Sequence, residues 1–439
     1  MMHNADPDNS FDEIAYQKAQ VVLTTFEDFL GADAFQKVLR AYVGTHRGGT
    51  ATTADFVSAL RDATSAETAT SFDQYVRSTG VPIVEMKRDC TAKQLALHAR
   101  DRRIVPVCVD INTKQPVCRL VGDDAVVELP ASCPETFGNS RAGYYHTVWL
   151  SDGPHGSTKK LDRKAERLRI VAGDDIAARI ERGELTGVEA LGELREFLDS
   201  GDSHTVLGGI AIARALDRLV GEAERPAWTA WLAKHVQGMR ADNMSELAEQ
   251  LQIARLELAP TSYSPSVVKD TAMAVDRQLA AMSITPMLVA IVAPSGGDKL
   301  FARIADRAKT APADEREEFY SSLGVFGAAQ APLAVALFAD ASIDAGDAWL
   351  AVEPMLSRPA TRNATWRALK PVLPAVMKRM ADDADELVAT LGSLCDQVSR
   401  DEVAAIDRGK TRQSASLAAI DRCIASRAKL GDLAGALAH

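Results

Sequence analysis

The sequence lacks the patterns that mark several broad classes of protein. In 439 residues there is no apolar run close to the roughly 18 residues that a membrane-spanning helix needs. Neither the G-x-x-x-x-G-K-[ST] loop that holds nucleotide phosphates nor the G-x-G-x-x-G turn of dinucleotide-binding folds occurs. The net charge of −10 argues against a general surface for nucleic acid or anionic membrane. We therefore expect no membrane span and no nucleic-acid partner.

Cysteine is also sparse. Six cysteines are too few for a disulfide scaffold, and no two are spaced C-x-x-C. Cys118 and Cys133 flank a predicted hairpin and would suit a disulfide in an oxidising compartment, but buried free thiols are an equal alternative. Cys395 and Cys423 lie in helical sequence, which favours core residues.

No arrangement of histidines favours a metal site. The motif H-E-x-x-H, whose spacing puts two imidazoles on one helix face, is absent. His146 and His155 are nine residues apart across a predicted loop, which is weak support for a metal site. The eight histidines are His3, His46, His98, His146, His155, His204, His235 and His439. We expect no metal cofactor within this chain, because catalytic zinc needs three protein ligands and an open position for water.

What the sequence does contain is typical of a soluble globular protein. Apolar residues make up 46% and charged residues 25%. The length suggests two or three domains. The start, M-M-H-N-A-D-P-D-N-S, has no basic-then-apolar signal peptide, so a cytoplasmic location is expected for the chain as written. A periplasmic or secreted location stays open for a longer parent protein.

Helical patterning marks the first 80 residues. Ser10 and Glu13 have capping-box spacing, and the apolar residues that follow recur at helical spacing up to a stop at Gly31. Thr52 or Thr53 is expected to cap a later helix. The pattern predicts helices over residues 10–31, 33–46, from 52 or 53 onward, and 71–78.

From about residue 81 the period changes from helical to alternating. Apolar and other side chains alternate along residues 105–111, as in a half-buried strand. Similar short runs occur at residues 81–86, 94–99, 117–121, 125–129 and 144–150. About six or seven short strands separated by turn residues predict a small β-sandwich.

From about residue 157 the pattern is helical again, with short breakers and no fixed repeat period, which favours an irregular stack of helix pairs. Asp202 or Ser203 is expected to cap a helix, and Trp228 and Trp231 are expected to be packing residues. The pair Asp174 and Asp175 is interpreted as a solvated helix end. The predicted fold is therefore mainly α with a small β-sandwich: terminal helices (1–80), sandwich (81–156) and an irregular, solenoid-like helical domain (157–439).

The most informative stretch is residues 11–56. It reads F-D-E-I-A-Y-Q-K-A-Q-V-V-L, then F-E-D-F-L-G-A-D-A-F-Q-K-V-L-R-A-Y, then A-T-T-A-D-F. It closely resembles the last helices of the catalytic domain of zinc-dependent aminopeptidases, the family of aminopeptidase N and the puromycin-sensitive aminopeptidase. In that family the tyrosine of Y-x-K donates a hydrogen bond to the tetrahedral intermediate, and Tyr16 and Lys18 stand in those places. Ala19 stands where the family usually has Gly.

Looser resemblances extend over the rest of the chain. They are V-P-V-C-V at residues 105–109, G-Y-Y at 143–145, R-P-A-T-R-N-A-T-W at 358–366 and L-C-D-Q-V-S-R-D-E-V at 394–403. The resemblance implies the C-terminal portion of a metallo-aminopeptidase, which removes N-terminal residues from peptides, without its zinc-binding region. It implies a peptide or a complementary N-terminal catalytic half as partner, and Tyr16 as transition-state stabiliser.

Two other interpretations stay open. In the first, the chain is a non-catalytic helical binding or scaffold module derived from that family. In the second, it is the product of an incomplete gene model. From spacing alone, Tyr16 is an aromatic residue at the edge of a helix. If the metal-bearing helices are absent, the first 60 residues are expected to expose an apolar face formed by Phe11, Ile14, Val22, Phe26 and Phe29, unless this block docks on the domains that follow.

Overall fold

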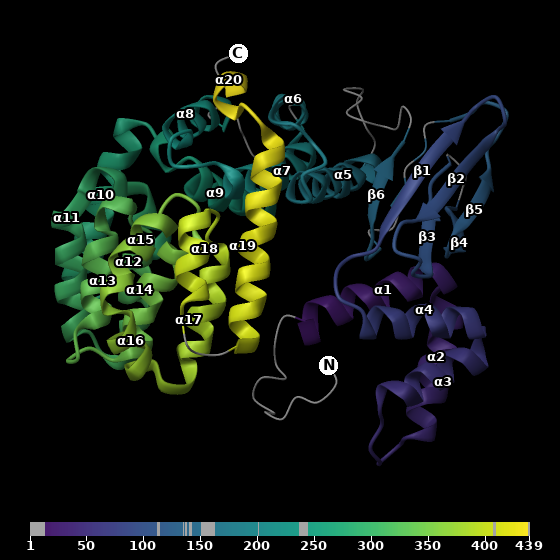
Figure 1. The fold of residues 1–439 in the computed structure, drawn as a ribbon, viewed down its shortest axis with the longest axis horizontal. Coiled ribbons are helices and arrows are strands. Elements are labelled where there is room, and N and C mark those ends of the chain that lie inside the picture. Colours follow the sequence, from purple (N-terminus) through teal and green to yellow (C-terminus); the bar gives the residue numbers. More distant parts are fainter. Residues whose placement is uncertain are drawn as a thin grey trace. The chain divides into compact units, whose positions relative to one another are not determined.

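The computed structural model describes residues 14–111, 115–134, 136, 138, 139, 143–150, 163–200, 202–236, 245–406 and 410–437. The predicted capping box of Ser10 and Glu13 lies outside these residues. Contacts divide the chain into two compact units, Met1–Asp175 and Ile176–His439. Within the described residues the order of parts is the predicted one: helices, then strands, then a long helical region (Figure 1).

The first unit begins with a block of short helices. They are a π-helical turn (Ile14–Lys18), α1 (Ala19–Leu30), α2 (Ala32–Thr45), α3 (Thr53–Ala63) and α4 (Ala66–Arg77). Gly31 separates α1 from α2 at φ +84°, a conformation that glycine adopts without steric cost. Thr52 caps α3 in a capping box with Asp55. The prediction that the fourth helix begins at residue 71 was wrong, because Ser65 accepts a hydrogen bond from the Thr68 amide at 3.1 Å and starts α4 at Ala66.

The strands follow α4. They are β1 (Ile83–Asp89), β2 (Gln94–Ala99), β3 (Val105–Val109), β4 (Val117–Val121), β5 (Asp124–Glu128) and β6 (His146–Trp149). Among the described residues they form a four-stranded sheet in the order β5-β2-β1-β6 and a two-stranded sheet, β3-β4. All pairs are antiparallel except β1 with β6. The predicted half-burial of β3 was wrong, because every residue of this strand is buried on both faces.

One apolar core joins the helices to the sandwich. Phe26, Phe56 and Phe72 from the helices lie in the same buried cluster as strand residues such as Val84 and Met86. The Phe26 ring meets the rings of Phe72 and Tyr75 edge to face, at centroid distances of 5.2 and 5.8 Å. The helical block therefore docks on the sandwich, which is the alternative in which Val22 and Phe26 are buried rather than exposed. Phe29 is half-buried, while Phe11 and the side chain of Ile14 lie outside the described residues.

All six cysteines lie in described residues and are paired. The disulfides are Cys90–Cys133, Cys108–Cys118 and Cys395–Cys423. The suggested pair Cys118–Cys133 was wrong, because the register of β3 on β4 places Cys108 directly opposite Cys118. Cys395 and Cys423 are bonded to each other rather than being isolated core thiols.

The second unit is helical throughout its described residues. After α5 (Arg163–Glu181), which runs across the boundary between the units, the helices are α6 (Gly187–Leu198), α7 (Ser203–Leu219), α8 (Arg225–Val236), α9 (Ser245–Leu258), α10 (Pro265–Ala280), α11 (Pro286–Thr310), α12 (Ala313–Gly324), α13 (Ala331–Ala339), α14 (Ala345–Ser357), α15 (Arg362–Leu369), α16 (Leu373–Met380), α17 (Ala384–Thr390), α18 (Gln397–Ala404), α19 (Lys410–Leu430) and α20 (Leu433–Leu437). Short 3-10 turns occur at Pro260–Ser262, Ala328–Gln330, Lys370–Val372, Ala381–Asp383 and Leu391–Ser393.

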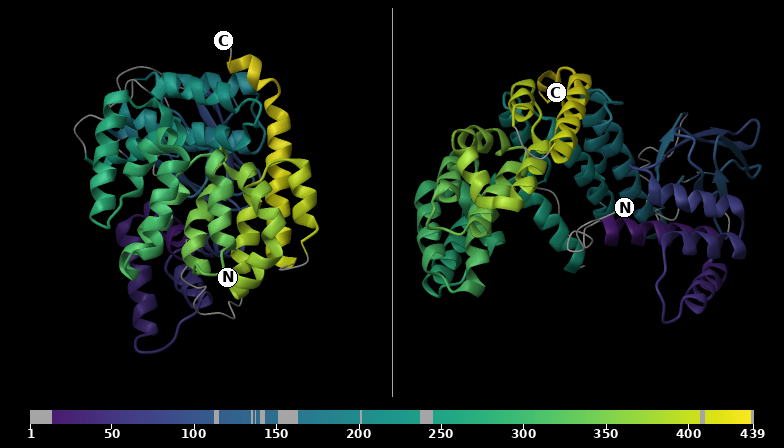
Figure 2. Two further views of the ribbon diagram at one scale, coloured as in Figure 1. Left: turned by 90° about the vertical axis from the view of Figure 1, so that its left-hand side faces the viewer. Right: turned by 60° about the horizontal axis from the view of Figure 1, so that its bottom comes forward.

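These helices form an irregular stack rather than a regular repeat. α11 is kinked near Pro294, where Gly297 leaves the helical conformation at φ +51°. α19 runs along one side of the stack in both views of Figure 2 and contacts α7, α17 and α18. Asp202 caps α7, as predicted, by accepting a hydrogen bond from the Thr205 amide at 2.7 Å. Among the described residues no single helix is long and apolar enough to cross a membrane, although the bent pair Glu315–Gly324 and Ala328–Ala339 meets that test jointly by length and composition.

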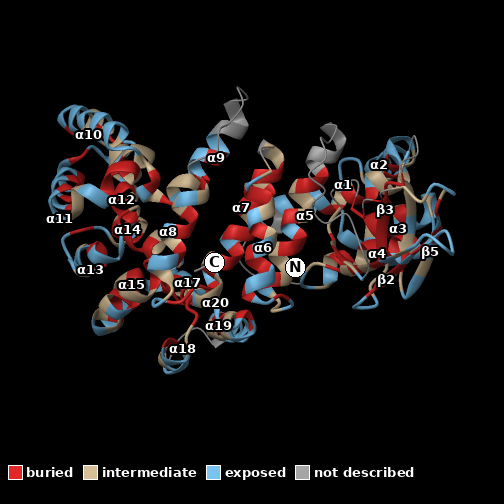
Figure 3. Ribbon diagram, turned by 90° about the horizontal axis from the view of Figure 1, so that it is seen from above, coloured by how far each residue is buried: buried red, intermediate tan, exposed pale blue. Residues whose placement is uncertain are grey.

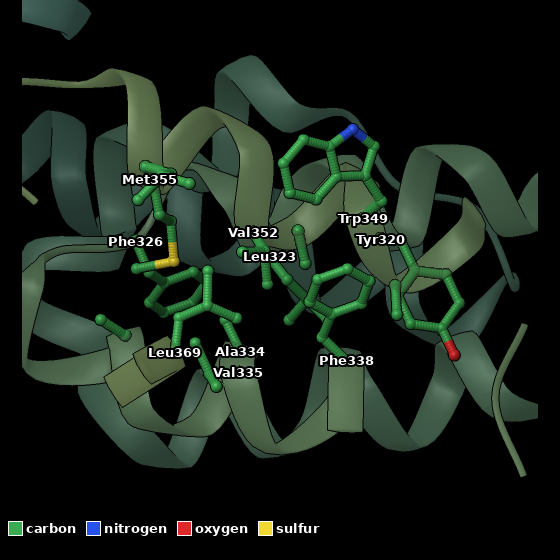
Figure 4. Close-up of a cluster of buried hydrophobic side chains, with 14 of the residues drawn as sticks. Tyr320, Leu323, Phe326, Ala334, Val335, Phe338, Trp349, Val352, Met355 and Leu369 are labelled. Atoms are coloured by element: carbon green, nitrogen blue, oxygen red, sulfur yellow. The ribbon is translucent and has the colours of Figure 1, made fainter. Parts of the chain in front are cut away.

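The core of the second unit lies between its central helices. Figure 3 shows several buried turns in α12 and α14, whereas α10 at the edge of the stack is mostly exposed. Aromatic and aliphatic side chains from α12 to α15 converge there, as the close-up in Figure 4 shows for Phe326, Phe338 and Trp349. The rings of Phe338 and Trp349 lie 5.6 Å apart.

Candidate functional site around Tyr16

Tyr16 lies on a helical turn of unusual geometry. Residues Ile14–Lys18 form a π-helical turn that runs directly into α1. Single π turns within helices are rare, and they are found frequently at functional sites. The Y-x-K segment therefore lies at a position where the backbone departs from regular α-helix.

The Tyr16 side chain is the most exposed aromatic group of the described helical block. It is 60% exposed, whereas Phe26, Phe35 and Phe72 are all buried. An exposed phenol hydroxyl is a hydrogen-bond donor that can reach a partner outside the core. The geometry is thus compatible with the predicted role of Tyr16 as an oxyanion donor, which stays a prediction.

Lys18, two residues along, has a different environment. Its Nζ donates a hydrogen bond to the carbonyl oxygen of Ser78 at 3.3 Å, just past the end of α4, and lies 5.7 Å from the centre of the Tyr144 ring. Partial burial, and then the charge of Arg103, hold the pKa of Lys18 below its ordinary value. A cation at a helix C-terminus stabilises the unpaired carbonyl groups there. The contacts of Lys18 therefore support a structural role.

The G-Y-Y segment of the sandwich, residues 143–145, contacts α1 and α4 next to this turn. The Tyr144 amide donates to the Thr25 hydroxyl of α1 at 2.9 Å, and the Tyr144 ring meets Tyr75 edge to face at 6.1 Å. The Asn139 side chain holds the turn by hydrogen bonds of 2.7 to 3.0 Å to the backbone of Gly143 and Tyr145. This segment fixes α1 against the sandwich and so fixes the direction in which the Tyr16 turn projects.

The structure does not assemble a zinc site from the residues it describes. Within them, no three His, Cys, Asp or Glu side chains come together as a metal ion requires. Three of the described histidines have other contacts: His98 Nδ1 lies 3.1 Å from Asp124, His146 Nδ1 lies 3.0 Å from Asp175, and His235 Nδ1 lies 2.8 Å from the Trp231 carbonyl. The described residues therefore do not fit a catalytic zinc ion, and His155 lies outside them.

A buried polar cluster on β6 and α5 was missed by the sequence analysis. Asp175 is buried and accepts a hydrogen bond from the Thr147 hydroxyl, while its other carboxylate oxygen lies 3.0 Å from His146 Nδ1. The interpretation of Asp174 and Asp175 as a solvated helix end was therefore wrong: both lie within α5, where Asp174 is exposed and Asp175 is buried. The one available signal was the adjacent His-Thr pair in a strand, because polar residues buried in a strand need partners.

Comparison with known proteins gives the clearest indication of origin. Residues 1–75 match the peptidase family M1 domain. Tricorn protease-interacting factor F2 from Thermoplasma volcanium is 24% identical over 216 residues, which are 47% of this chain and 27% of that protein. Aminopeptidase N from Escherichia coli is 31% identical over 125 residues, 27% of this chain and 14% of that enzyme. Aminopeptidase M1 from Arabidopsis thaliana is 33% identical over 85 residues, 19% of this chain and 10% of that enzyme.

Each of these matches covers less than a third of the relative's own length. The matches show homology to M1 aminopeptidases and support an origin in the metallo-aminopeptidase family. The M1 match covers the π turn with Tyr16 and all of α1 to α3.

Proposed function

We propose that this chain supplies the terminal catalytic-domain helices, the sandwich and the helical domain of a zinc aminopeptidase, and that it is inactive without a zinc-bearing segment. Such an enzyme removes N-terminal residues from peptides. The match of residues 1–75 to the peptidase domain supports the proposal, as do the order of the three parts and the absence of a zinc donor set among the described residues. The zinc-bearing segment is supplied either on the same polypeptide or by a separate chain.

The observation that this proposal rests on is the exposure of Tyr16 within the matched segment. Tyr16 lies on a π turn and is 60% exposed, whereas Phe26 and Phe72 of the same helical block are buried. In the assembled enzyme its hydroxyl donates to the oxygen that becomes negative in the tetrahedral intermediate. One such donor lowers the barrier by roughly 3 to 4 kcal/mol. Tyr16 has this role only where an intermediate is being formed.

The surface for the zinc-bearing partner lies on the helical block. Among its described residues the exposed large apolar side chains are Tyr16, Val21, Leu39 and Val43. Leu39 and Val43 are four residues apart on α2 and therefore share one helix face. This face, rather than the buried Val22 and Phe26, is where we place the complementary catalytic half.

Elemental analysis and a hydrolysis assay on the chain alone test the first part of the proposal. The purified chain is expected to bind no stoichiometric zinc and not to hydrolyse aminoacyl-arylamide substrates. One equivalent of tightly bound zinc with chelator-sensitive hydrolysis would contradict it. Addition of a zinc-bearing half from a related aminopeptidase is then expected to yield a complex that hydrolyses these substrates. If no complex forms, the alternative of a non-catalytic binding module is favoured.

Three disulfides support an oxidising location rather than the cytoplasmic one expected from the start of the sequence. They pair every cysteine of the chain, including two cysteines 43 residues apart. Disulfides rarely persist where glutathione and thioredoxin keep thiols reduced. We therefore place the protein in the periplasm or outside the cell.

A further inference from the structure

An open groove lies in the second unit, far along the chain from Tyr16. It has a volume of about 590 Å³ and is bounded by three helices, α6, α8 and α20. These helices contact one another at the same end of the stack (Figure 1). The groove is lined by Arg195, Ala227, Ala230, Trp231, Lys234, His235 and Leu437. Its size falls in the range of small-molecule sites, roughly 300 to 1,000 Å³.

A rigid aromatic stack forms one wall of this groove. The Trp231 ring is nearly parallel to the Trp228 ring, with centroids 5.9 Å apart, and the His235 ring stacks on Trp231 with centroids 3.8 Å apart. Trp228 is fully buried and its indole nitrogen donates to Asp217 at 2.7 Å. The stack is therefore anchored in the core, and its outer ring, His235, is held in place without a ligand.

The hydrogen bond of His235 fixes which ring atom remains for a ligand. Nδ1 lies 2.8 Å from the carbonyl oxygen of Trp231, one helical turn earlier. Because a carbonyl oxygen only accepts, Nδ1 must hold a hydrogen, and Nε2 remains as the atom that can bond to a ligand.

Positive charge gathers at this groove in a chain whose net charge is −10. Arg195 at the end of α6 and Lys234 at the end of α8 are both exposed, and among the described residues neither has an ion-pair partner. A guanidinium and an ammonium group flanking an imidazole ring are suited to a carboxylate. The apolar side chains of Ala227, Ala230 and Leu437 line the remainder.

We propose that the groove between α6, α8 and α20 binds a small organic carboxylate with a flat apolar body. The carboxylate faces Arg195 and Lys234, and the body lies along the His235 ring and Leu437. A structural role competes with this proposal, because basic residues in the last turn of a helix also stabilise the helix dipole. A binding measurement combined with a stability measurement separates the two roles.

The test is titration of the full chain with phenylacetate, with phenethyl alcohol as the uncharged analogue and acetate as the analogue without a ring. Calorimetry is expected to show one saturable site for phenylacetate with a Kd of about a millimolar, as suits a ligand of this size. Both analogues are expected to bind more weakly by about tenfold, because each lacks one of the two recognised features. Equal binding of phenylacetate and phenethyl alcohol, or no saturation, would overturn the proposal.

Variants connect the binding to the groove. Arg195→Gln combined with Lys234→Gln is expected to weaken phenylacetate binding by about tenfold, since two charges are removed. The single variant Lys234→Arg, with Arg195 unchanged, keeps both positive charges and is expected to bind phenylacetate nearly as tightly as the parent does. Lys269→Gln, an exposed lysine on α10 outside the groove, is the matched control and should bind as the parent does. If the double variant binds phenylacetate normally and only lowers the melting temperature, the basic residues are structural and the proposal is wrong.

Discussion

At the scale of single residues, Arg358 shows what the R-P-A-T-R-N-A-T-W segment contributes to the fold. Its guanidinium donates to the carbonyl oxygens of Gly324, Val325 and Phe326 at 2.8, 3.1 and 2.5 Å, at the end of α12. Burial is the main cause that lowers the pKa of Arg358, to about 10. Arg362 behaves similarly toward the carbonyl oxygens of Arg218 and Ser393, at 2.8 and 2.7 Å. The two arginines of this segment therefore bind carbonyl groups at the ends of helices, which is a structural role.

Replacement of Arg358 by methionine tests this role. The change removes the Arg358 donor from three partly buried carbonyl groups, so the free energy of unfolding is expected to fall by about 3 kcal/mol. Arg303→Met is the matched control, because Arg303 forms a solvent-exposed pair with Asp276 and its loss should cost less than about 1 kcal/mol. Urea unfolding measures both. Equal effects of the two substitutions would show that the Arg358 contacts do not stabilise the fold.

Some residue roles were predictable and others were not. Gly31 and Thr52 were identified because their functions are local: a positive φ in one case and a cap bond three residues away in the other. Asp175 was misread because its partners, His146 and Thr147, lie almost thirty positions earlier and come close only in the folded chain. Lys18 was identified only as a member of the Y-x-K motif, whereas its contact to Ser78 depends on how α1 lies against α4.

At the scale of helices and strands, the predicted order of helical and strand segments was confirmed, but the pairing of strands and of cysteines was not predicted. The switch from helical to alternating period placed the strands correctly, because one face of most of them is buried. β3 departed from the pattern because Cys108 on its other face is covered by the bond to Cys118 and by the Tyr145 hydroxyl, 3.3 Å from the Cys108 amide. The pairing of Cys108 with Cys118 follows the register of β3 on β4, which no sequence spacing specifies.

Because one core joins the helices to the sandwich, a destabilising substitution in a helix should also destabilise the strands. Phe26→Ala removes a fully buried ring and is expected to lower the free energy of unfolding of the first unit by about 3 to 5 kcal/mol. Hydrogen exchange should then speed up together in α4 and β2, while helices of the second unit keep their protection.

The control for this experiment is Val43→Ala on α2. Val43 is 60% exposed, so its truncation should change stability by less than about 0.5 kcal/mol. If Phe26→Ala speeds exchange in α4 but leaves β2 protected, the helical block and the sandwich are separate cooperative units.

At the scale of the whole molecule, the disulfides decide between two locations. Protein made in an oxidising compartment and unfolded in denaturant should expose no thiol to a thiol reagent, and all six cysteines should react after reduction. Each disulfide is expected to contribute about 2 to 4 kcal/mol to the free energy of unfolding. Free thiols in the unreduced protein would contradict both the pairing and the proposed location.

For the whole molecule, we propose that a zinc-bearing partner makes this chain an active aminopeptidase. The order of helices, sandwich and helical stack could be predicted from periodicity, because each part buries its own core. The histidine spacing predicted no zinc site in this chain, and it does not indicate which residues elsewhere would supply one. Catalysis therefore has to be tested on the assembled pair.

The most direct measurement is kcat of the complex between this chain and a zinc-bearing half, with Tyr16→Phe compared with the parent. Loss of the phenol hydroxyl should lower kcat by about 10²- to 10³-fold, because an oxyanion donor is removed, while the complex elutes unchanged in gel filtration. Tyr42→Phe, which removes a hydroxyl elsewhere in the same helical block, should leave kcat unaltered. An active complex in which Tyr16→Phe turns over as fast as the parent would contradict the assignment of Tyr16.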